Sequence, residues 1–427
     1  MIAISVFWFG VSFFWAGMLT LVLQERVAEF IPKESHGAYL GVLAAGGALF
    51  STVVELIAGP YSDRCQSRWG RRRPFIFHGV IWCIPFIVLF TYSGSFWQLM
   101  VCFAAIQFFL NWANGPYQAV IPDVVPPHRH GLASSYMGAM TLLGTGLGLA
   151  LVGALLDKEP MLLSHWSADA RMRLVGWVYG GVLLSTMLWT HCGLREKPWS
   201  PKNPADAKVK LRHVFDIRLK DAPNFRLLTL SRFFFNAGFY TAVYFITFYL
   251  RDSIGLGDGY LKSAFILFEI VTFAGVIGTF MVARNADRHS KKSIIFMCSG
   301  LLCAAAIAFL LVSDFRAVML LGVLFGIAWG AFAAVDWALA ANLVPKADEA
   351  GRYMAIWHIS MTLPQVVAPM IAGPVADALN RYSPGLGWRA VFAFIPIYVL
   401  AGAALLRKLD EAPVQQVESE SMRVQPQ

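Results

Sequence analysis

Four amide side chains recur at helical spacing inside one long apolar run. They are Gln107, Asn111, Asn114 and Gln118. Steps of four, three and four residues put them on one face of a helix. An amide both donates and accepts hydrogen bonds, which matches the paired demands of a solute rich in hydroxyl groups. The same row could instead bond neighbouring helices, as amides in membranes often do, but four in succession favour a solute pathway.

A second polar row lies further along the chain. Its members, which step by four throughout, are Arg232, Asn236, Tyr240 and Tyr244. This spacing again predicts one face of a helix. Two roles stay open for the arginine. Its long side chain could reach the membrane interface, or it could serve in the interior of the protein.

A third polar set falls on one face of a later run, where His358 and Gln365 flank Thr362. A neutral imidazole could hydrogen-bond a solute hydroxyl or pass a proton on. We therefore add His358 and Gln365 to the candidate binding residues, with a structural role as the alternative.

Three carboxylates interrupt apolar runs. Burial disfavours the charged form of a carboxyl group, so an acid in such a place could take up and release a proton. Asp336 is the first candidate for proton coupling and Glu269 the second. Asp336 could instead be the buried partner of a cation such as Arg232. Glu55 lies close to a basic loop, and we expect it to pair with the arginines there.

The elements that carry these rows must be membrane helices. Apolar residues make up 57% of the 427 residues and charged residues only 14%. A soluble domain carries roughly 25% charged residues, so this chain has too little charge to cover a surface in water. Its net charge of +9 then needs no nucleic-acid partner, because basic residues gather in the cytoplasmic loops of membrane proteins.

Twelve apolar runs are long enough to span a bilayer, since a helical span takes about 20 residues. The predicted spans are 4–23, 37–58, 75–93, 97–120, 132–156, 174–192, 227–250, 262–283, 294–313, 317–342, 354–378 and 388–406. We therefore expect an all-α membrane protein with twelve transmembrane helices. The runs 75–93 and 97–120 lie so close together that a tight hairpin must join them.

The distribution of Lys and Arg predicts the orientation. With the N-terminus inside, most of the 35 Lys and Arg residues fall in cytoplasmic loops and the tail, as expected because basic residues resist translocation. Both termini are therefore predicted to be cytoplasmic, and the first run is interpreted as an uncleaved helix. The predicted parts are an N-terminal six-helix bundle at 1–192, a cytoplasmic connector at 193–225, a C-terminal six-helix bundle at 226–408 and a disordered cytoplasmic tail at 409–427.

Two charged motifs of the first half recur in the second. One counterpart pair is Asp63-Arg64 with Arg71-Arg72-Arg73, and Asp287-Arg288 with Lys291-Lys292. The other is Asp123-Val124-Val125-Pro126 with Gly131, and Asn342-Leu343-Val344-Pro345 with Gly351. Both pairs share nearly the same offset, which chance does not readily produce. Two related six-helix bundles joined by a long basic connector are typical of the major facilitator fold, a class of secondary transporters.

The loop after the second run also resembles a particular group within that class. Its string is Gly59-x-x-Ser62-Asp63-Arg64-Cys65-x-Ser67-Arg68-x-Gly70-Arg71-Arg72-Arg73-Pro74-Phe75. This string resembles the corresponding loop of sucrose–proton symporters, in the glycoside–pentoside–hexuronide:cation symporter group. The Asp-Arg and Gly-Arg-Arg core is common among major facilitators, whereas the Ser, the Cys and the Pro-Phe ending are more specific. Three further segments, Asn111–Pro116, Asp123–Pro126 and Asp336–Leu339, resemble bacterial members.

One position departs from the plant members of this group. Those carriers have an aspartate eight residues before a Gly-Pro pair in helix 4, where it is implicated in proton coupling. Here the pair is Gly115-Pro116, and eight residues before it stands Gln107. Glutamine does not ionise, so the resemblance does not carry the plant proton site over to this chain.

The charged loops also suggest a mechanical role. Pairs of Arg with a carboxylate have strong geometry, while exposed pairs contribute only about 0–1 kcal/mol, so they suit a latch that must open. We expect Asp63 to pair with Arg71–Arg73 and with the end of a helix across the cytoplasmic face. The predicted gating residues are Asp63, Arg64, Arg71, Arg72, Arg73, Asp287 and Arg288. The alternative is that the arginines only keep the loop on the cytoplasmic side.

The resemblance implies a secondary transporter of a small sugar, a disaccharide such as sucrose or maltose, driven by proton symport. A sodium-coupled glycoside carrier and an exporter of another small solute stay open as alternatives. An enzyme is disfavoured because the sequence has no metalloprotease, nucleophile-elbow, phosphate-loop or Cys/His metal motif. We expect no cofactor, H⁺ or Na⁺ as the coupling ion, a sugar and the lipid bilayer as partners, no obligate protein partner, and a place in the bacterial inner membrane.

Overall fold

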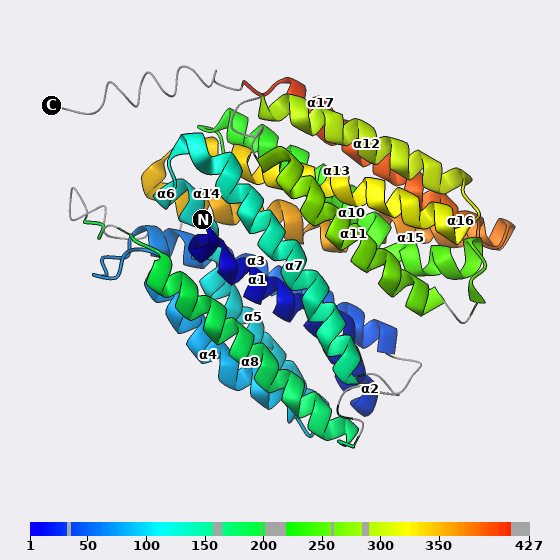
Figure 1. Ribbon diagram of the computed structural model, residues 1–427, viewed down its shortest axis with the longest axis horizontal. Helices are drawn as coiled ribbons and strands as arrows, with labels where there is room; N and C mark the ends of the chain where they lie inside the picture. Colours follow the sequence, from blue (N-terminus) through cyan, green and yellow to red (C-terminus); the bar gives the residue numbers. More distant parts are fainter. Residues whose placement is uncertain are drawn as a thin grey trace. The chain divides into compact units, whose positions relative to one another are not determined.

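The computed structural model describes residues 1–31, 36–156, 163, 165–196, 198–200, 219–257, 260–283 and 290–410. Within them every regular element is a helix and none is a strand, as Figure 1 shows. The first helices are α1 (Ile2–Gly17), π-helical η1 (Met18–Val22), α2 (Leu23–Phe30), α3 (His36–Asp63), α4 (Arg73–Thr91), α5 (Phe96–Gln118), α6 (Val120–Val124), η3 (Pro127–Arg129), α7 (His130–Leu156) and α8 (Ala168–Gly193). The later helices are α10 (Pro223–Phe248), π-helical η5 (Tyr249–Ser253), α11 (Tyr260–Ala283), α12 (Lys291–Leu311), α13 (Phe315–Asn342), η7 (Ala347–Glu349), α14 (Ala350–Thr362), α15 (Pro364–Tyr382), α16 (Leu386–Ala390), η8 (Val391–Ala393) and α17 (Phe394–Arg407).

Ten stretches of the described residues are helical, long and apolar enough to cross a membrane. They are Ile2–Phe30, Arg73–Thr91, Phe96–Gln118, Pro127–Leu156, Pro223–Ser253, Ser263–Val282, Lys291–Leu311, Phe315–Asn342, Ala350–Tyr382 and Leu386–Arg407. Two further predicted spans, 37–58 and 174–192, are also helical, as parts of α3 and α8. These two helices are not among the ten, so the count of twelve spans stays a prediction.

A tight hairpin joins α4 to α5, as the close spacing of the two apolar runs predicts. Ser95 is the N-cap of α5, and its Oγ accepts a hydrogen bond from the main-chain N–H of Gln98 at 3.4 Å. The Gln98 side chain returns the contact by accepting from the N–H of Gly94 at 2.9 Å. The two side chains therefore satisfy donors that the start of a helix would otherwise leave open.

The described chain divides into two compact units. The first comprises Met1–Val124, Met140–Ile217 and Lys346–Ala355, and the second comprises Val125–Ala139, Arg218–Pro345 and Ile356–Gln427. The boundaries differ from the predicted halves, because the start of α7 belongs to the second unit and the start of α14 to the first. Most of the predicted connector at 193–225, and the tail beyond residue 410, lie outside the described residues.

In the first unit, α4 packs against α5 and α8, α3 packs against α5, and α1 packs against α8. Glycines allow another close approach, between α1 and α7. A Cβ atom at Gly144 or Gly148 would run into the main-chain oxygen of Phe9 or Phe13. Small residues let membrane helices approach in this way.

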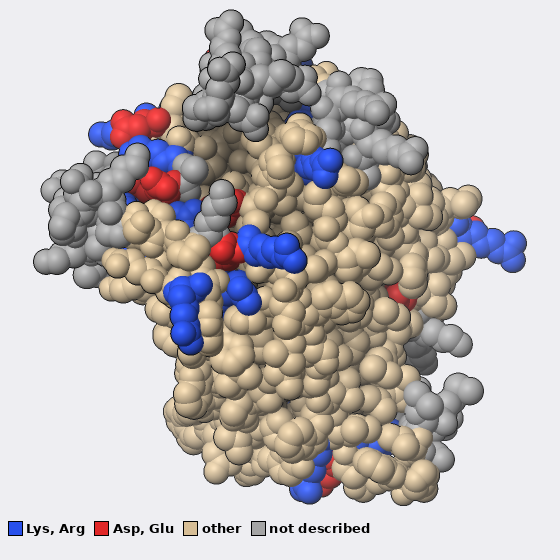
Figure 2. All heavy atoms as spheres, turned by 60° about the vertical axis from the view of Figure 1, so that its left-hand side comes forward, with Lys and Arg blue, Asp and Glu red and all other residues tan. Residues whose placement is uncertain are grey.

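In the second unit, α11 and α12 pack against α13, and α10 packs against α15 and α17. Here too a glycine marks a close approach, since a Cβ at Gly330 of α13 would meet the backbone of Gly275 of α11. Figure 2 shows one face of the molecule, where uncharged residues cover most of the visible area and charged residues gather in a few groups. This distribution suits a protein with only 14% charged residues that spans a bilayer.

Candidate functional site

The predicted amide row lies on α5, inside the first unit, and all four side chains are buried. Asn111 Nδ2 donates to Gln107 Oε1 at 3.0 Å and to the Gln107 main-chain oxygen at 2.7 Å. The other end of the row has open capacity, because Asn114 Oδ1 and Gln118 Oε1 have no hydrogen-bond partner among the described residues. Buried amide oxygens without partners are costly, and a hydroxyl-bearing solute would satisfy them.

Glu55 of α3 lies at the end of this row. It is 2% exposed, and its Oε2 accepts a hydrogen bond from Gln118 Nε2 at 3.4 Å. The expectation that Glu55 pairs with the arginine loop is wrong, since Arg71 and Arg72 of that loop pair with Asp63 and Asp123 and the contact of Glu55 is with Gln118. The structure therefore adds a buried carboxylate to the amide row of the first unit.

The second polar row lies on α10, inside the second unit, and begins with an ion pair. Arg232 Nη1 lies 3.1 Å from Asp336 Oδ2 of α13, with side chains 8% and 4% exposed. Of the two roles left open for Arg232, the interior one therefore holds, as does the alternative that Asp336 partners a cation. A buried ion pair of this kind marks a functional position in a membrane helix more often than a stabilising one.

Two indole rings surround the same guanidinium. The Arg232 Cζ lies 3.2 Å from the ring centroid of Trp357 and 5.7 Å from that of Trp337. The two indoles meet edge to face with centroids 4.9 Å apart. Arg232 Nη2 also points to the sulfur of Met361 at 3.8 Å. A cation is attracted to the face of an indole, so the rings share the arginine with Asp336.

The remainder of the second row continues along α10. Asn236 Nδ2 donates to the main-chain oxygen of Arg232 at 3.0 Å. Tyr240 accepts a hydrogen bond at its hydroxyl from Gln365 Nε2 at 2.9 Å, which joins α10 to α15. Tyr244 is 41% exposed, with its ring centroid 6.4 Å from that of Tyr240. The structure therefore brings Gln365 to the row, while Tyr244 lies at its exposed end.

Two other predicted residues lie in the second unit. His358 of α14 is buried and interacts electrostatically with Arg232. Glu269 of α11 is partly buried, and its Oε1 has no hydrogen-bond partner among the described residues. His358 therefore belongs to the surroundings of the Arg232–Asp336 pair, whereas no contact brings Glu269 to it.

The charged loop of the first unit centres on Arg72, which is fully buried. Its Nε donates to Asp123 Oδ2 and its Nη2 to Asp63 Oδ1, both at 2.7 Å, and its Nη1 donates to Ser62 Oγ. Burial opposes the charged form, but the carboxylates of Asp123 and Asp63 outweigh it and raise the pKa of Arg72. Every guanidinium nitrogen therefore has a partner.

Asp63 also caps a helix. Its two carboxylate oxygens accept from the main-chain N–H groups of Gly351 and Arg352, at 2.9 and 3.0 Å. These residues form the first turn of α14, where free N–H groups and the helix dipole favour an anion. The predicted contacts of Asp63, with an arginine of the loop and with the end of a helix, are both present.

The other predicted gating residues have weaker contacts. Arg71 Nη2 lies 3.0 Å from Asp123 Oδ1, and the Arg64 guanidinium lies 5.8 Å from the ring centroid of Trp199. Arg73 begins α4. The repeated pair, Asp287 and Arg288, lies outside the described residues.

Two residues that contact Arg72 were not predicted from the sequence to be site residues. Asp123 belongs to the repeated Asp-Val-Val-Pro motif, so the repeat was a signal that could have found it. Glu196 follows α8, and its Oε2 accepts a hydrogen bond from the main-chain N–H of Arg72 at 2.8 Å. Burial raises the pKa of Glu196, although the contacts with Arg72 act against the rise.

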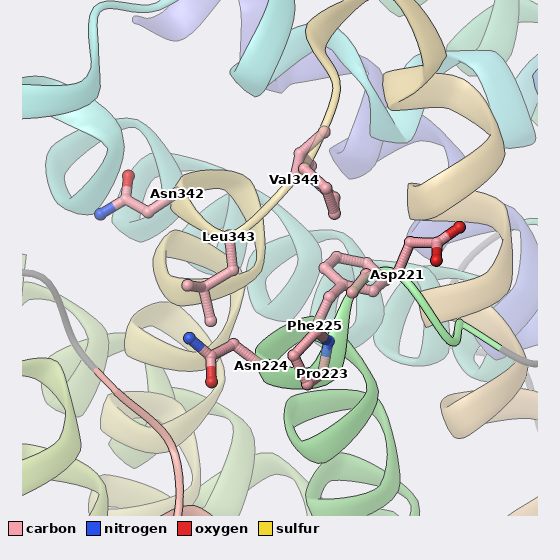
Figure 3. A pocket seen from close by; sticks show the side chains of 9 residues that line it. Asp221, Pro223, Asn224, Phe225, Asn342, Leu343 and Val344 are labelled. Atoms are coloured by element: carbon pink, nitrogen blue, oxygen red, sulfur yellow. The ribbon is translucent and has the colours of Figure 1, made fainter.

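A pocket of about 300 Å³ opens where α10 starts and α13 ends, and Figure 3 shows the residues that line it. Its lining residues are Asp221–Phe225 and Asn342–Pro345. One of them, Asn224, donates from Nδ2 to the main-chain oxygen of Asp410 at 3.1 Å. No residue of the polar rows lines this pocket, so it is separate from the candidate solute site.

Comparison with known proteins identifies the chain's family. The sequence profile described as Major Facilitator Superfamily matches residues 1–284 and 270–425. The chain belongs to the Major Facilitator Superfamily. It is therefore a multi-pass membrane transporter and not an enzyme.

Two transport proteins of other organisms are similar to this chain in sequence. Sucrose transport protein SUT5 of Oryza sativa subsp. indica is 24% identical over 457 residues, which cover 90% of this chain and 84% of that protein. The lactose permease of Lactobacillus delbrueckii subsp. bulgaricus is 21% identical over 391 residues, 83% of this chain and 61% of the permease.

Solved structures of superfamily members share the fold. The human organic anion transporter MFSD10 has a TM-score of 0.73 at 16% identity and covers 95% of this chain and 97% of its own. The proton:xylose symporter XylE, bound to 6-bromo-6-deoxy-D-glucose, has a TM-score of 0.70 at 13% identity, with 98% of each chain covered. At such identities the likeness concerns the fold alone.

Proposed function

We propose that this chain is a secondary active transporter that moves a small sugar, a disaccharide such as sucrose or maltose, by proton symport with alternating access. The observation that carries the proposal is the buried amide row of α5 with its open oxygens. A sugar presents many hydroxyl groups, each a donor and an acceptor. An amide side chain can accept from one hydroxyl and donate to another. The names of the sucrose and lactose relatives support the same solute class.

We assign solute binding to polar residues of both rows and their surroundings. They are Gln107, Asn111, Asn114, Gln118, Asn236, Tyr240, Tyr244, His358 and Gln365. Most of these side chains are buried inside a membrane protein, where polar groups are rare unless they serve a function.

We assign proton coupling to Asp336 and Arg232, with Glu269 as the second acid. Proton uptake by Asp336 would cancel its charge and release Arg232 from the ion pair, and loss of the proton would restore it. The direct contact of 3.1 Å supports this assignment, because the charge of one partner then decides the freedom of the other.

We assign gating to the loop around Arg72 and to its repeat. The residues are Asp63, Arg64, Arg71, Arg72, Arg73, Asp287 and Arg288. The bonds from Asp63 to the start of α14 support this assignment, because they would have to break if the two elements moved apart.

The finer membrane topology is also part of the proposal. We infer twelve spans in two six-helix bundles, both termini in the cytoplasm, and the bacterial inner membrane as location. The division into 1–192, 193–225, 226–408 and 409–427 goes with it. No cofactor and no obligate protein partner are needed for such a carrier.

Uptake into proteoliposomes tests the proposal. Purified protein should accumulate radiolabelled sucrose or maltose when the outside is made acidic, and a protonophore should abolish the accumulation. No saturable uptake of any of several disaccharides would refute the sugar assignment.

The Asp336→Asn variant tests the coupling residue. Asparagine cannot bind the proton, so we expect no accumulation under a pH gradient, while sugar exchange between the two sides continues. Accumulation at the wild-type level would remove Asp336 from the mechanism, and Glu269→Gln in the same assay tests the second acid.

A sodium-coupled glycoside carrier is the second candidate function. It is favoured by the oxygens near Glu55, namely its own carboxylate and the open oxygens of Asn114 and Gln118, since hard cations prefer oxygen ligands. Uptake that follows an imposed sodium gradient and ignores the pH gradient would support this candidate over proton symport.

A further inference from the structure

Arg232 and Asp336 are close enough for an ion pair but lack the geometry that such pairs prefer. An arginine normally offers a carboxylate two parallel N–H donors, which makes a fork-like contact. Here the Nη1–Oδ2 distance is 3.1 Å, yet neither Nε nor Nη1 of Arg232 has a hydrogen-bond partner among the described residues. Something therefore holds the guanidinium away from the fork-like position.

The group that lies against the guanidinium is the indole of Trp357. Its ring centroid lies 3.2 Å from Arg232 Cζ, while Trp337 adds a second indole at 5.7 Å. Trp357 is completely buried and Arg232 is 7% exposed. They belong to α14 and α10, two helices labelled in Figure 1. The ring cannot move aside without disturbing its edge-to-face contact with Trp337.

We propose, on the basis of the proposed function, that Trp357 is a positioning residue that holds Arg232 over its ring and so keeps Asp336 able to accept a proton. The attraction of the guanidinium to an indole face does not depend on pH, because the ring carries no proton to gain or lose. When Asp336 is protonated, Arg232 therefore retains a site in an interior where a cation without a partner is very costly.

Removal of the ring should have the opposite consequence. Without Trp357 the guanidinium is free to turn toward Asp336 and form the two-point contact. A carboxylate held in that way binds a proton less readily. The other titratable groups that interact with this pair, among the described residues, are Tyr240 of α10 and His358 of α14. Among the described residues of α11 and α12, which also pack against α13, no titratable group acts on Arg232 or Asp336.

The test follows the protonation of Asp336 directly, without sugar. Infrared difference spectra of the purified protein, titrated with pH, report the C=O band of a protonated carboxyl group, and Asp336→Asn identifies the band. In Trp357→Leu we expect the midpoint about one pH unit lower than in wild type, the size of a buried cation–π interaction. Trp357→Phe keeps an aromatic face, so its midpoint should lie between the two.

A matched control is Trp329→Leu on α13. Its indole stacks on Phe239 with centroids 4.1 Å apart, so its midpoint should equal that of wild type. The proposal is overturned if the Trp357→Leu midpoint stays or rises, or if Trp329→Leu lowers it equally. If Trp357→Leu fails to fold, the Trp357→Phe midpoint decides. Sugar uptake is measured separately, so a wild type that transports no disaccharide refutes the proposed function alone.

Discussion

Two buried arginines, one in each unit, are held in opposite ways. Arg72 donates from all three guanidinium nitrogens to Asp63, Asp123 and Ser62, and two carboxylates oppose its single charge. Among the described residues, Arg232 faces one carboxylate without an aligned hydrogen bond, and two indole faces and the Met361 sulfur are its other contacts. Every guanidinium nitrogen of Arg72 thus has a hydrogen-bond partner, whereas Nε and Nη1 of Arg232 have none among the described residues.

The different surroundings of the two arginines suit them to different roles. A guanidinium with every nitrogen bonded keeps its position, because a move would leave several buried groups without partners at once. A guanidinium held by one carboxylate and an uncharged ring can lose the carboxylate and still stay in place. Arg72 therefore suits a structural clamp around which contacts are made and broken, whereas Arg232 suits a charge switch.

The largest loss of stability is expected when Arg72 is replaced. Arg72→Gln leaves Asp63 buried without its cation and Asp123 with Arg71 alone as an ion-pair partner, so we expect a loss of about 3–5 kcal/mol in the free energy of unfolding. Unfolding in detergent, followed by tryptophan fluorescence, measures it. Arg71→Gln is the matched control, since the one ion pair of Arg71 among the described residues joins it to Asp123 and its side chain is 14% exposed. Equal losses in both variants would contradict the claim that the buried partners of Arg72 hold it more firmly than those of Arg71.

At Arg232 the same change should cost less. Arg232→Gln leaves Asp336 without its cation, but this carboxylate can take up a proton, so we expect about 1–3 kcal/mol. The double variant with Asp336→Asn should recover most of that loss, because it removes the buried charge as well. A double-mutant cycle measures the coupling. A loss at Arg232 as large as that at Arg72 would contradict the switch interpretation.

The contact of Asp63 with α14 should contribute a smaller amount. In Asp63→Ala the side chain offers no acceptor to the N–H groups of Gly351 and Arg352, so we expect about 0.5–2 kcal/mol from the lost cap, beyond what Arg72 loses with this carboxylate. Hydrogen exchange should then quicken at these two amides. Asp314→Ala, at the start of α13, removes a comparable cap and should leave the α14 amides unchanged.

The smallest effect concerns Glu196 and pH. Its folded pKa is raised above the ordinary value of 4.5 by burial, so the folded state binds the proton more readily than the unfolded chain. The resulting stability is present below pH 4.5 and is lost as the pH rises through the folded pKa. Glu196→Gln cannot ionise, so melting temperatures of variant and wild type should diverge above pH 4.5. Parallel curves would contradict the raised pKa.

Helical spacing predicts which side chains share a helix face, and the structure agrees for α5 and α10. Spacing does not predict partners on other helices. Glu55 lies only two turns before Asp63 on α3, so an interaction with the nearby arginines was a reasonable expectation. The structure instead directs its carboxylate to Gln118 of α5, because packing of α3 on α5 decides which neighbour a buried side chain meets.

The membrane class, the polar rows and the repeated charged motifs could be predicted from the sequence, since composition and periodicity along one helix are local properties. That Asp123 completes the partners of Arg72, and that Trp357 shares Arg232 with Asp336, depends on how distant helices pack. The physical reason is the same for both arginines. A charge in an apolar interior must find its partner at a distance of a few ångströms, and helices far apart in sequence supply it only when they pack together.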